Sequence, residues 1–291
     1  MQDIPWRMAR SLSSRAERDR TGLTVAEGPP SVQSAVSSGV AIEFLAVSLS
    51  YSALPAYARI EEGLSGAGPR AIKVFRVPDA LFERMSETKT PQGILCVLPA
   101  PFRYPGGGPR SPWQAPLYLY GVDIQDPGNA GTLVRAAAAA GASQAVFAGE
   151  SSDVFSPKCI RASAGAVFNV ALSQEDAVQD PLLLLRKLDE QGVRLYKAAP
   201  RDGAAPWAVD MCGPCAVVVG NEARGLRPEI LAGPGELVSI PMPGGTESLN
   251  VALASGMILY EAVRQRLSSC FEGPSPNGIM PERGKRSGGL P

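Results

Sequence analysis

The chain has 291 residues, 45% of them hydrophobic, and its 28 Lys and Arg residues balance its 28 Asp and Glu residues. The length suits two domains, no apolar stretch approaches the roughly 18 residues of a membrane span, and the neutral total charge gives no global support for nucleic-acid binding. The absence of His excludes Ser-His-Asp and Cys-His catalysis and His-ligated zinc.

Residues 1–22 read as a basic, helical lead-in with five Arg residues and three acids, and they lack the apolar core of a secretory signal. Clustered Arg side chains can contact phosphates, which makes Arg10 a candidate, although solvation is the alternative for each exposed Arg.

Residues 23–98 are predicted to form a small α/β unit, because short apolar runs alternate with segments of helical periodicity bounded by Pro and Gly. The predicted strands are 25–28, 44–48, 72–77 and 93–98, and the predicted helices are 29–39, 57–64 and 78–85.

Residues 99–116 hold six prolines and three consecutive glycines. That composition is incompatible with an ordinary helix or strand, so we predict a linker between two domains.

Residues 117–267 again alternate strands with helices, which predicts a parallel sheet covered on both faces. The tail, residues 268–291, is rich in Gly, Pro and Arg and is expected to be disordered. The predicted strands are 117–121, 144–148, 167–171, 193–198, 215–219 and 237–240, and the predicted helices are 130–141, 157–164, 181–191, 228–231 and 248–267.

The five Cys residues show no regular spacing, which argues against a disulfide framework and fits a reducing cytoplasm. Cys212 and Cys215 form a C-x-x-C pair. No second pair follows and Gly213-Pro214 makes a turn between them, so we favour a turn over a metal or redox site.

Three segments, 123–135, 217–226 and 240–252, each place small and polar residues just after a strand-like run and just before a helix-like one. In an open α/β sheet the ligand lies outside the carboxyl ends of the strands. The three segments are therefore expected to converge on one site, whose Asn, Arg, Glu and Ser side chains suit a polar cofactor and a ribose or phosphate substrate.

In the first segment Asn129 is expected to cap the following helix, and Arg135 lies near the helix N-terminus, where a bound anion is favoured. The segment lacks the G-x-G-x-x-G dinucleotide fingerprint. In the second segment Gly220 is expected to let a ligand approach the backbone. Asn221 and Glu222 follow it, and a helix cap is the alternative role for this carboxylate.

The third segment begins with two prolines and two glycines, a rigid loop whose free backbone groups suit the edge of an adenine. Ser248 is expected to cap the last helix, with Asn250 in its first turn, whereas Met242 is more typical of packing. Away from these segments, Lys158 and Arg161 flank a Ser/Gly turn and can contact phosphates, with solvation as the alternative.

The three segments resemble the motifs of the SpoU (TrmH-type) RNA 2′-O-methyltransferases of the SPOUT superfamily. The matching residues are Asn129…Arg135, Gly220-Asn221-Glu222…Gly225 and Pro241-Met242…Ser248-Leu249-Asn250-Val251, with weaker matches at Ser163-Ala164-Gly165-Ala166, Tyr260-Glu261-Ala262, Glu27-Gly28 and 89–93. The resemblance covers about residues 25–267. Ala223 departs from the Gly that the family often has there.

The resemblance implies an α/β fold with a parallel-sheet SPOUT domain and a C-terminal trefoil knot, preceded by a small α/β substrate-binding domain. It also implies an obligate homodimer with its site at the subunit interface, and no metal or membrane partner. S-adenosylmethionine is the implied cofactor, with implied contacts at Gly220, Asn221, Ile240, Met242 and Leu249.

The implied catalytic residues are Arg135, Asn129, Glu222, Ser248 and Asn250, and the implied RNA-binding residues are Arg10, Glu27, Lys158 and Arg161. A guanidinium is a very poor base, so we interpret Arg135 as orienting the ribose 2′-hydroxyl and its phosphate. The implied activity is cytoplasmic 2′-O-methylation of structured RNA, with 23S-type ribosomal RNA favoured by the N-terminal module. Transfer RNA methylation, a resistance methyltransferase acting on ribosomal RNA and a non-catalytic ribosome-assembly protein remain alternatives. An unrelated nucleotide-binding α/β enzyme is a further alternative, against which the missing dinucleotide and P-loop patterns argue.

Overall fold

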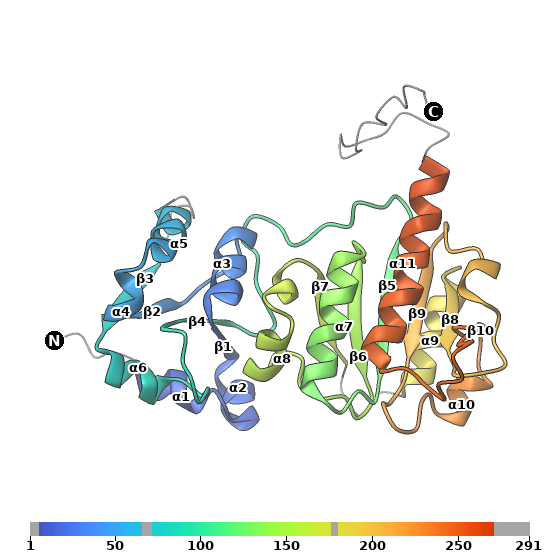
Figure 1. Cartoon of the computed structure of the whole chain (residues 1–291), viewed down its shortest axis with the longest axis horizontal. Coiled ribbons are helices and arrows are strands. Elements are labelled where there is room, and N and C mark those ends of the chain that lie inside the picture. The colour runs from blue at the N-terminus through green and yellow to red at the C-terminus, as the bar shows by residue number, and fades with distance from the viewer. Residues whose placement is uncertain (1–5, 66–71, 176–179, 271–291) are drawn as a thin grey trace, which may run out of the picture.

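The computed structural model describes residues 6–65, 72–175 and 180–270, which fold into two sheets with their helices (Figure 1). The basic lead-in is helical, as predicted, and forms α1 and α2. The elements of the first part are α1 (Trp6–Ser11), α2 (Arg15–Thr21), β1 (Leu23–Glu27), α3 (Pro29–Ser38), β2 (Phe44–Ser48), α4 (Leu49–Ser52), α5 (Pro55–Ser65), β3 (Lys73–Val77), α6 (Asp79–Met85) and β4 (Ile94–Pro99).

The first sheet has the order β1-β4-β2-β3. Strand β4 runs antiparallel to both of its neighbours, whereas β2 and β3 are parallel. All six residues of β4 are buried, because helices or the second unit cover both of its faces. This sheet therefore gives the first unit a mixed α/β architecture.

The second sheet is entirely parallel, as predicted, with the order β10-β8-β9-β5-β6-β7. Its elements are β5 (Leu117–Val122), α7 (Pro127–Ala139), β6 (Gln144–Ala148), α8 (Pro157–Ala162), η1 (Ala166–Phe168), β7 (Ala171–Gln174), α9 (Pro181–Glu190), β8 (Arg194–Ala198), η2 (Pro206–Ala208), β9 (Cys215–Val219), α10 (Pro228–Leu231), β10 (Glu236–Val238) and α11 (Val251–Cys270).

Strand β9 shows how helices cover both faces of this sheet. Successive side chains of a strand point to opposite faces. Val217 and Val219 pack in the core that contains α7 and α11, whereas Val218 packs in the core that contains α9 and α10. A strand buried on both sides needs a continuous apolar run, and all five residues of β9 are buried.

The two sheets belong to units that pack directly against each other. Arg18 on α2 forms an ion pair with Asp153 at 2.6 Å, and the two side chains are 6% and 16% exposed. The Thr24 hydroxyl donates to the carbonyl oxygen of Phe155 at 2.6 Å. One hydrophobic core runs from α3 and β4 of the first unit into α7 and α8 of the second, so the boundary between the units is part of the folded interior.

Pro99 ends strand β4. The rest of the predicted linker, residues 100–116, has no helix or strand, but it is packed onto the second unit. Phe102 contacts the ring of Phe168 at 4.8 Å between centroids. The Trp113 indole N–H donates to the carbonyl oxygen of Ala140 at 2.8 Å. Buried Arg266 on α11 donates to the carbonyl oxygens of Ala115 and Pro116. The end of this segment is thereby fixed to the last helix.

One predicted strand and the predicted start of the tail differ from the structure. The predicted strand 167–171 is instead the short helix η1 followed by strand β7. Ala164 and Gly165 take positive φ angles of 51° and 86°, which turn the chain and delay the strand. The last helix continues to Cys270, so residues 268–270 are helical rather than disordered, and the rest of the predicted tail lies outside the described residues.

Within the three described ranges, no helix is long and apolar enough to cross a membrane, and no three His, Cys, Asp or Glu side chains are grouped so as to hold a metal ion. Cys212 and Cys215 are free thiols, and Cys215 is buried.

Candidate functional site

A cavity of about 380 Å³ opens at the carboxyl ends of three adjacent strands. Its wall includes the last residues of β8, β9 and β10, which are Ala198, Val219 and Val238. Val251, the first residue of α11, also lines the cavity. This is the edge of a parallel sheet at which ligands bind.

The five residues predicted to contact a cofactor all line this cavity. They come from two of the three polar segments, the turn after β9 and the loop between β10 and α11. The five residues are Gly220, Asn221, Ile240, Met242 and Leu249.

Gly220 lines the cavity, and its missing side chain also has a role in the fold. A Cβ atom there would lie 2.4 Å from the backbone of both Gly225 and Leu226, so the missing side chain makes room for the chain's own turn. Asn221 and Gly225 exchange backbone hydrogen bonds of 3.0 and 2.9 Å across that turn. The turn is therefore tightly closed against the end of β9.

Asn221 is a structural residue of the same turn and is only 7% exposed. Its side-chain oxygen accepts the backbone N–H groups of Ala223 and Arg224, both at 3.0 Å. Its side-chain amide donates to the carbonyl oxygen of Asp123 at 3.0 Å. Asn221 thus joins the second polar segment to the first.

Three predicted catalytic residues form one hydrogen-bonded network beside the cavity. The Asn129 amide donates to Glu222 at 3.0 Å, and the Asn250 amide donates to the Asn129 oxygen at 3.0 Å. The Glu222 carboxylate also accepts the backbone N–H groups of Gln125 and Asp126 at 3.3 and 3.2 Å. The structure thereby brings all three polar segments together, and the N-terminus of α7 holds the carboxylate.

Both predicted helix caps were wrong. Helix α7 begins at Pro127, a favoured first residue, so Asp126 is its N-cap and accepts the N–H of Asn129 at 2.9 Å. Helix α11 begins at Val251, and Asn250 caps it by accepting the N–H groups of Ala252 and Leu253 at 2.9 and 3.3 Å. In both places the cap lies next to the first helical residue.

Of the two remaining predicted catalytic residues, Ser248 lines the cavity and Arg135 does not. Exposed Ser248 lines the cavity, where its hydroxyl is available to a ligand. Arg135 is exposed on α7, does not line the cavity, and makes no hydrogen bond or ion pair with any residue that the structure describes. It lies three residues after Thr132, on the side of α7 that borders α11.

An ion pair that sequence reasoning missed lies next to the turn after β9, because Asn221 of that turn donates to the carbonyl oxygen of Asp123. The Asp123 carboxylate, 7% exposed, accepts two hydrogen bonds of 2.6 Å from Arg227 and one of 2.8 Å from the N–H of Glu150. Burial raises the pKa of Asp123, but these hydrogen bonds outweigh it and hold the pKa below its ordinary value of 3.8. Asp123 has a φ of 57°, unusual for a residue other than Gly.

Ala199 and Pro200, which follow β8, also line the cavity and were not predicted to do so. The signal was present, because a Pro follows a predicted strand at the same edge of the sheet.

The four predicted RNA-binding residues separate into two groups. Arg10 donates to the carbonyl oxygen of Ser86. Glu27 is 5% exposed and accepts the hydroxyls of Ser86 at 2.5 Å and Thr88 at 2.8 Å, so it faces the interior. These two residues hold the segment before β4.

The other group is on α8. Exposed Lys158 lies 3.9 Å from the Asp126 carboxylate, and half-buried Arg161 has one terminal nitrogen, Nη1, that is buried without a hydrogen-bond partner among the described residues.

Comparison with known proteins identifies relatives of both units. Residues 116–260 match the SpoU rRNA Methylase family, and residues 7–96 match the MRM3-like substrate binding domain. An uncharacterized tRNA/rRNA methyltransferase from Synechocystis sp. is 34% identical over 206 residues, which cover 70% of this chain and 72% of the relative.

A 23S rRNA (guanosine(2553)-2′-O)-methyltransferase, RlmP of Bacillus subtilis, is 28% identical over 252 residues, 86% of this chain and 92% of that protein. The crystal structure of an AdoMet-bound rRNA methyltransferase from Sinorhizobium meliloti has a TM-score of 0.72 and 27% identity, and the match covers 91% of this chain and 95% of that one.

Proposed function

The chain belongs to the SpoU rRNA methylase family, and we propose that it is an S-adenosylmethionine-dependent enzyme that methylates the 2′-oxygen of a ribose in ribosomal RNA. The observation that carries this proposal is the cavity at the ends of β8, β9 and β10, beside which the Glu222, Asn129 and Asn250 side chains are joined.

The cavity fits the cofactor in size and chemistry. Its 380 Å³ lies within the roughly 300–1,000 Å³ of small-molecule sites. Its apolar wall, including Ile240, Met242 and Leu249, suits an adenine, and its charged side chains, Glu222 and Arg224, suit a charged amino-acid end. We propose that the backbone at Gly220, Ile240, Met242 and Leu249 holds the cofactor, which supplies an activated methyl group when bound.

The catalytic side chains are proposed to place the ribose. Glu222 is already held by two backbone N–H groups and Asn129, so its free lone pairs have a defined direction. Ser248 offers a hydroxyl at the cavity wall. The 2′-hydroxyl loses its proton as its oxygen takes the methyl group. Arg135 orients that hydroxyl and the adjacent phosphate, and the proton passes to the phosphate or to a transiently deprotonated Arg135.

We also propose that the enzyme is a homodimer formed through α11. Leu253, Met257 and Tyr260 recur at helical spacing and are 51%, 45% and 69% exposed. They line an apolar groove of about 460 Å³ with Thr132 of α7. A second copy of this helix face would cover the groove, and it would bring Arg135 from one subunit toward the cavity of the other.

Mixing two inactive variants tests that arrangement. Arg135→Ala and Glu222→Ala proteins, unfolded together and refolded, form mixed dimers in which one site has both native residues, so partial activity returns. No recovery, with mixed dimers demonstrated by differently tagged subunits, places both residues of each site in one subunit and contradicts the shared site.

The trefoil knot and the cytoplasmic location are proposed with the family. In support of the knot, the chain passes from β9 to β10 at the sheet edge and then returns to pack α11 on α7 and β9. In support of the location, the proposed substrate is ribosomal RNA.

Methyl transfer from labelled S-adenosylmethionine tests the function. We expect label in protein-free ribosomal RNA, recovered as a 2′-O-methylated nucleoside after digestion. Label in transfer RNA instead would favour the transfer RNA alternative. Cofactor binding in calorimetry without transfer to either RNA would favour the non-catalytic alternative. Label on a base would contradict the proposal.

A further inference from the structure

Two thiols that methyl transfer does not use lie at the amino end of β9, whereas the cavity lies at its carboxyl end. Cys215 is the first residue of β9, and Cys212 precedes it by three positions. The sequence favoured a turn between them, and the chain does bend at residues 212–214. A bend brings the two thiols of a C-x-x-C pair together, and redox proteins close a disulfide at this spacing.

The bend places Cys215 against the backbone of Cys212. The Cys215 thiol donates to the carbonyl oxygen of Met211 at 3.7 Å, and that oxygen belongs to the peptide group that contains the Cys212 nitrogen. Gln265 of α11 accepts the N–H of Met211 at 2.7 Å and donates to the carbonyl oxygen of Val209 at 2.9 Å. Helix α11 therefore holds the segment in which both cysteines lie.

A buried guanidinium contacts the Cys215 sulfur. Arg266 is 3% exposed, and its Nη2 nitrogen lies 3.5 Å from that sulfur and 2.8 Å from the carbonyl oxygen of Gly213. A neighbouring Arg favours the thiolate, which is the nucleophilic form of a cysteine. Burial raises the pKa of Cys215, and the Arg266 guanidinium opposes that shift. Cys215 is thus a buried thiol with a cation beside its sulfur.

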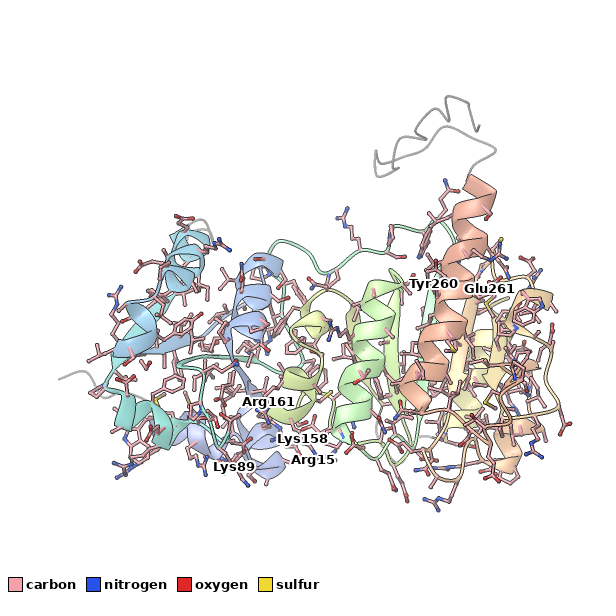
Figure 2. The ribbon with its side chains drawn as sticks, viewed as in Figure 1. Arg15, Lys89, Lys158, Arg161, Tyr260 and Glu261 are labelled. Atoms are coloured by element: carbon pink, nitrogen blue, oxygen red, sulfur yellow. The ribbon has the colours of Figure 1, made fainter. Side chains whose placement is uncertain are left out.

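Cys212 is the accessible member of the pair. It is half-buried, whereas Cys96 and Cys159 are fully buried, and burial raises the pKa of these two thiols to about 12. Glu261, labelled on α11 in Figure 2, raises the pKa of the exposed Arg264, and the charge of a Cys212 thiolate adds to that rise. Cys212 therefore also lies near a cation of α11, and among these three cysteines a small oxidant reaches it first.

We propose that Cys212 and Cys215 form a redox-active dithiol, which a hydroperoxide converts into an intramolecular disulfide. The Cys212 thiolate attacks one peroxide oxygen and the O–O bond breaks, which leaves a sulfenic acid on Cys212 and, from hydrogen peroxide, releases water. The Cys215 thiolate then attacks the Cys212 sulfur, the S–S bond forms, and the departing hydroxide takes up a proton to give a second water. Both sulfurs are oxidised and the peroxide is reduced. A thiol reductant reverses the reaction by exchange.

Peptide mass spectrometry tests this site without any measurement of methyl transfer. The full chain with Cys270→Ser is treated with hydrogen peroxide, unfolded in urea, alkylated and digested with trypsin. The tryptic peptide 202–224 contains Cys212 and Cys215 and no other cysteine. We expect this peptide to lack both alkyl groups and the mass of two hydrogen atoms, and to carry both groups again when dithiothreitol precedes alkylation. Cys96 and Cys159 are internal controls that remain fully alkylated.

Single-cysteine variants separate the two steps, and the small change from Cys to Ser preserves the fold. In Cys215→Ser the sulfenic acid of Cys212 lacks its partner, so it accumulates and reacts with dimedone. In Cys212→Ser the buried Cys215 stays reduced and is alkylated after unfolding. Peptide 202–224 with both alkyl groups after peroxide treatment would overturn the proposal. Equal dimedone labelling of Cys212 in the wild type and in Cys215→Ser, or oxidation of Cys96 and Cys159 to the same extent, would overturn it as well.

Discussion

Asn250 performs two functions that substitution can separate. Its side-chain oxygen caps α11 by accepting the N–H groups of Ala252 and Leu253, and its amide donates to Asn129 at 3.0 Å. Asn250→Asp keeps the acceptor and removes the donor. Asn250→Ala removes both. We therefore predict that the two variants lose activity alike but differ in stability.

The structure sets the size of each effect. Loss of an N-cap costs about 1 kcal/mol, which lowers the Tm of a domain of 150–250 residues by roughly 2–4 °C, and we expect this only for Asn250→Ala. Loss of the Asn250–Asn129 hydrogen bond costs about 0.5–1.5 kcal/mol, or roughly 2- to 13-fold in rate. A carboxylate facing the Asn129 oxygen near Glu222 adds repulsion, so Asn250→Asp falls at the slower end of that range.

Circular dichroism during heating measures the first effect, and initial rates of methyl transfer to ribosomal RNA measure the second. Asn250→Ser is the matched control, because Ser also caps helices well and adds no charge. Wild-type turnover in Asn250→Asp would refute a catalytic role for the network. A fall in Tm as large as that of Asn250→Ala would refute the assignment of the cap.

Three further predictions concern other parts of the site. Arg135→Ala removes an exposed side chain that has no partner in the described structure, so the free energy of unfolding changes by less than about 0.5 kcal/mol. Cofactor affinity is unchanged, while methyl transfer falls on the order of 100-fold. Retained turnover contradicts the role of Arg135. Gly220→Ala places a Cβ 2.4 Å from the facing backbone and opens the turn, so calorimetry shows weaker cofactor binding. The control variant Gly213→Ala, which has open space around it, binds the cofactor normally. Equal cofactor affinities of the two variants would be inconsistent with the closed turn. Asp123→Asn weakens the hydrogen bonds to Arg227, so we expect a loss of about 1.5–3 kcal/mol at pH 7. The pKa of Asp123 in the folded protein lies below the ordinary 3.8, so its carboxylate stabilises the fold fully above pH 3.8 and loses this effect as the pH falls through the folded pKa. Urea unfolding therefore shows the stabilities of the variant and the wild type converging at acid pH. A stability difference that does not change with pH argues against this linkage.

Local sequence patterns were sufficient to predict the bounds of several strands. The bounds of β2, β6 and β9 were predicted correctly, because each is an apolar run that ends at a polar residue or Gly. The strand expected at 167–171 failed because the positive φ angles of Ala164 and Gly165 insert a turn. The starts of α7 and α11 lie three residues from the predicted ones, because each of these starts contains more than one side chain that is able to cap it.

At the site, too, local sequence predicted the motif residues but not the contacts between distant parts of the chain. The motif residues of the second and third segments were expected at one sheet edge and line the cavity together. The Asp123–Arg227 pair joins residues 104 positions apart, and no periodicity predicts such a contact. Gly220 was expected to let a ligand approach the backbone, and it lines the cavity. That its missing side chain also makes room for the turn depends on how the chain closes after β9, which the local sequence does not show.

A crystal structure of the protein with S-adenosylhomocysteine tests the central claim most directly. The account predicts the nucleoside in the cavity at the ends of β8, β9 and β10, in contact with the backbone at Gly220, Ile240 and Leu249. Density for the nucleoside elsewhere, or the absence of heat when the same molecule is titrated into the protein, would contradict it.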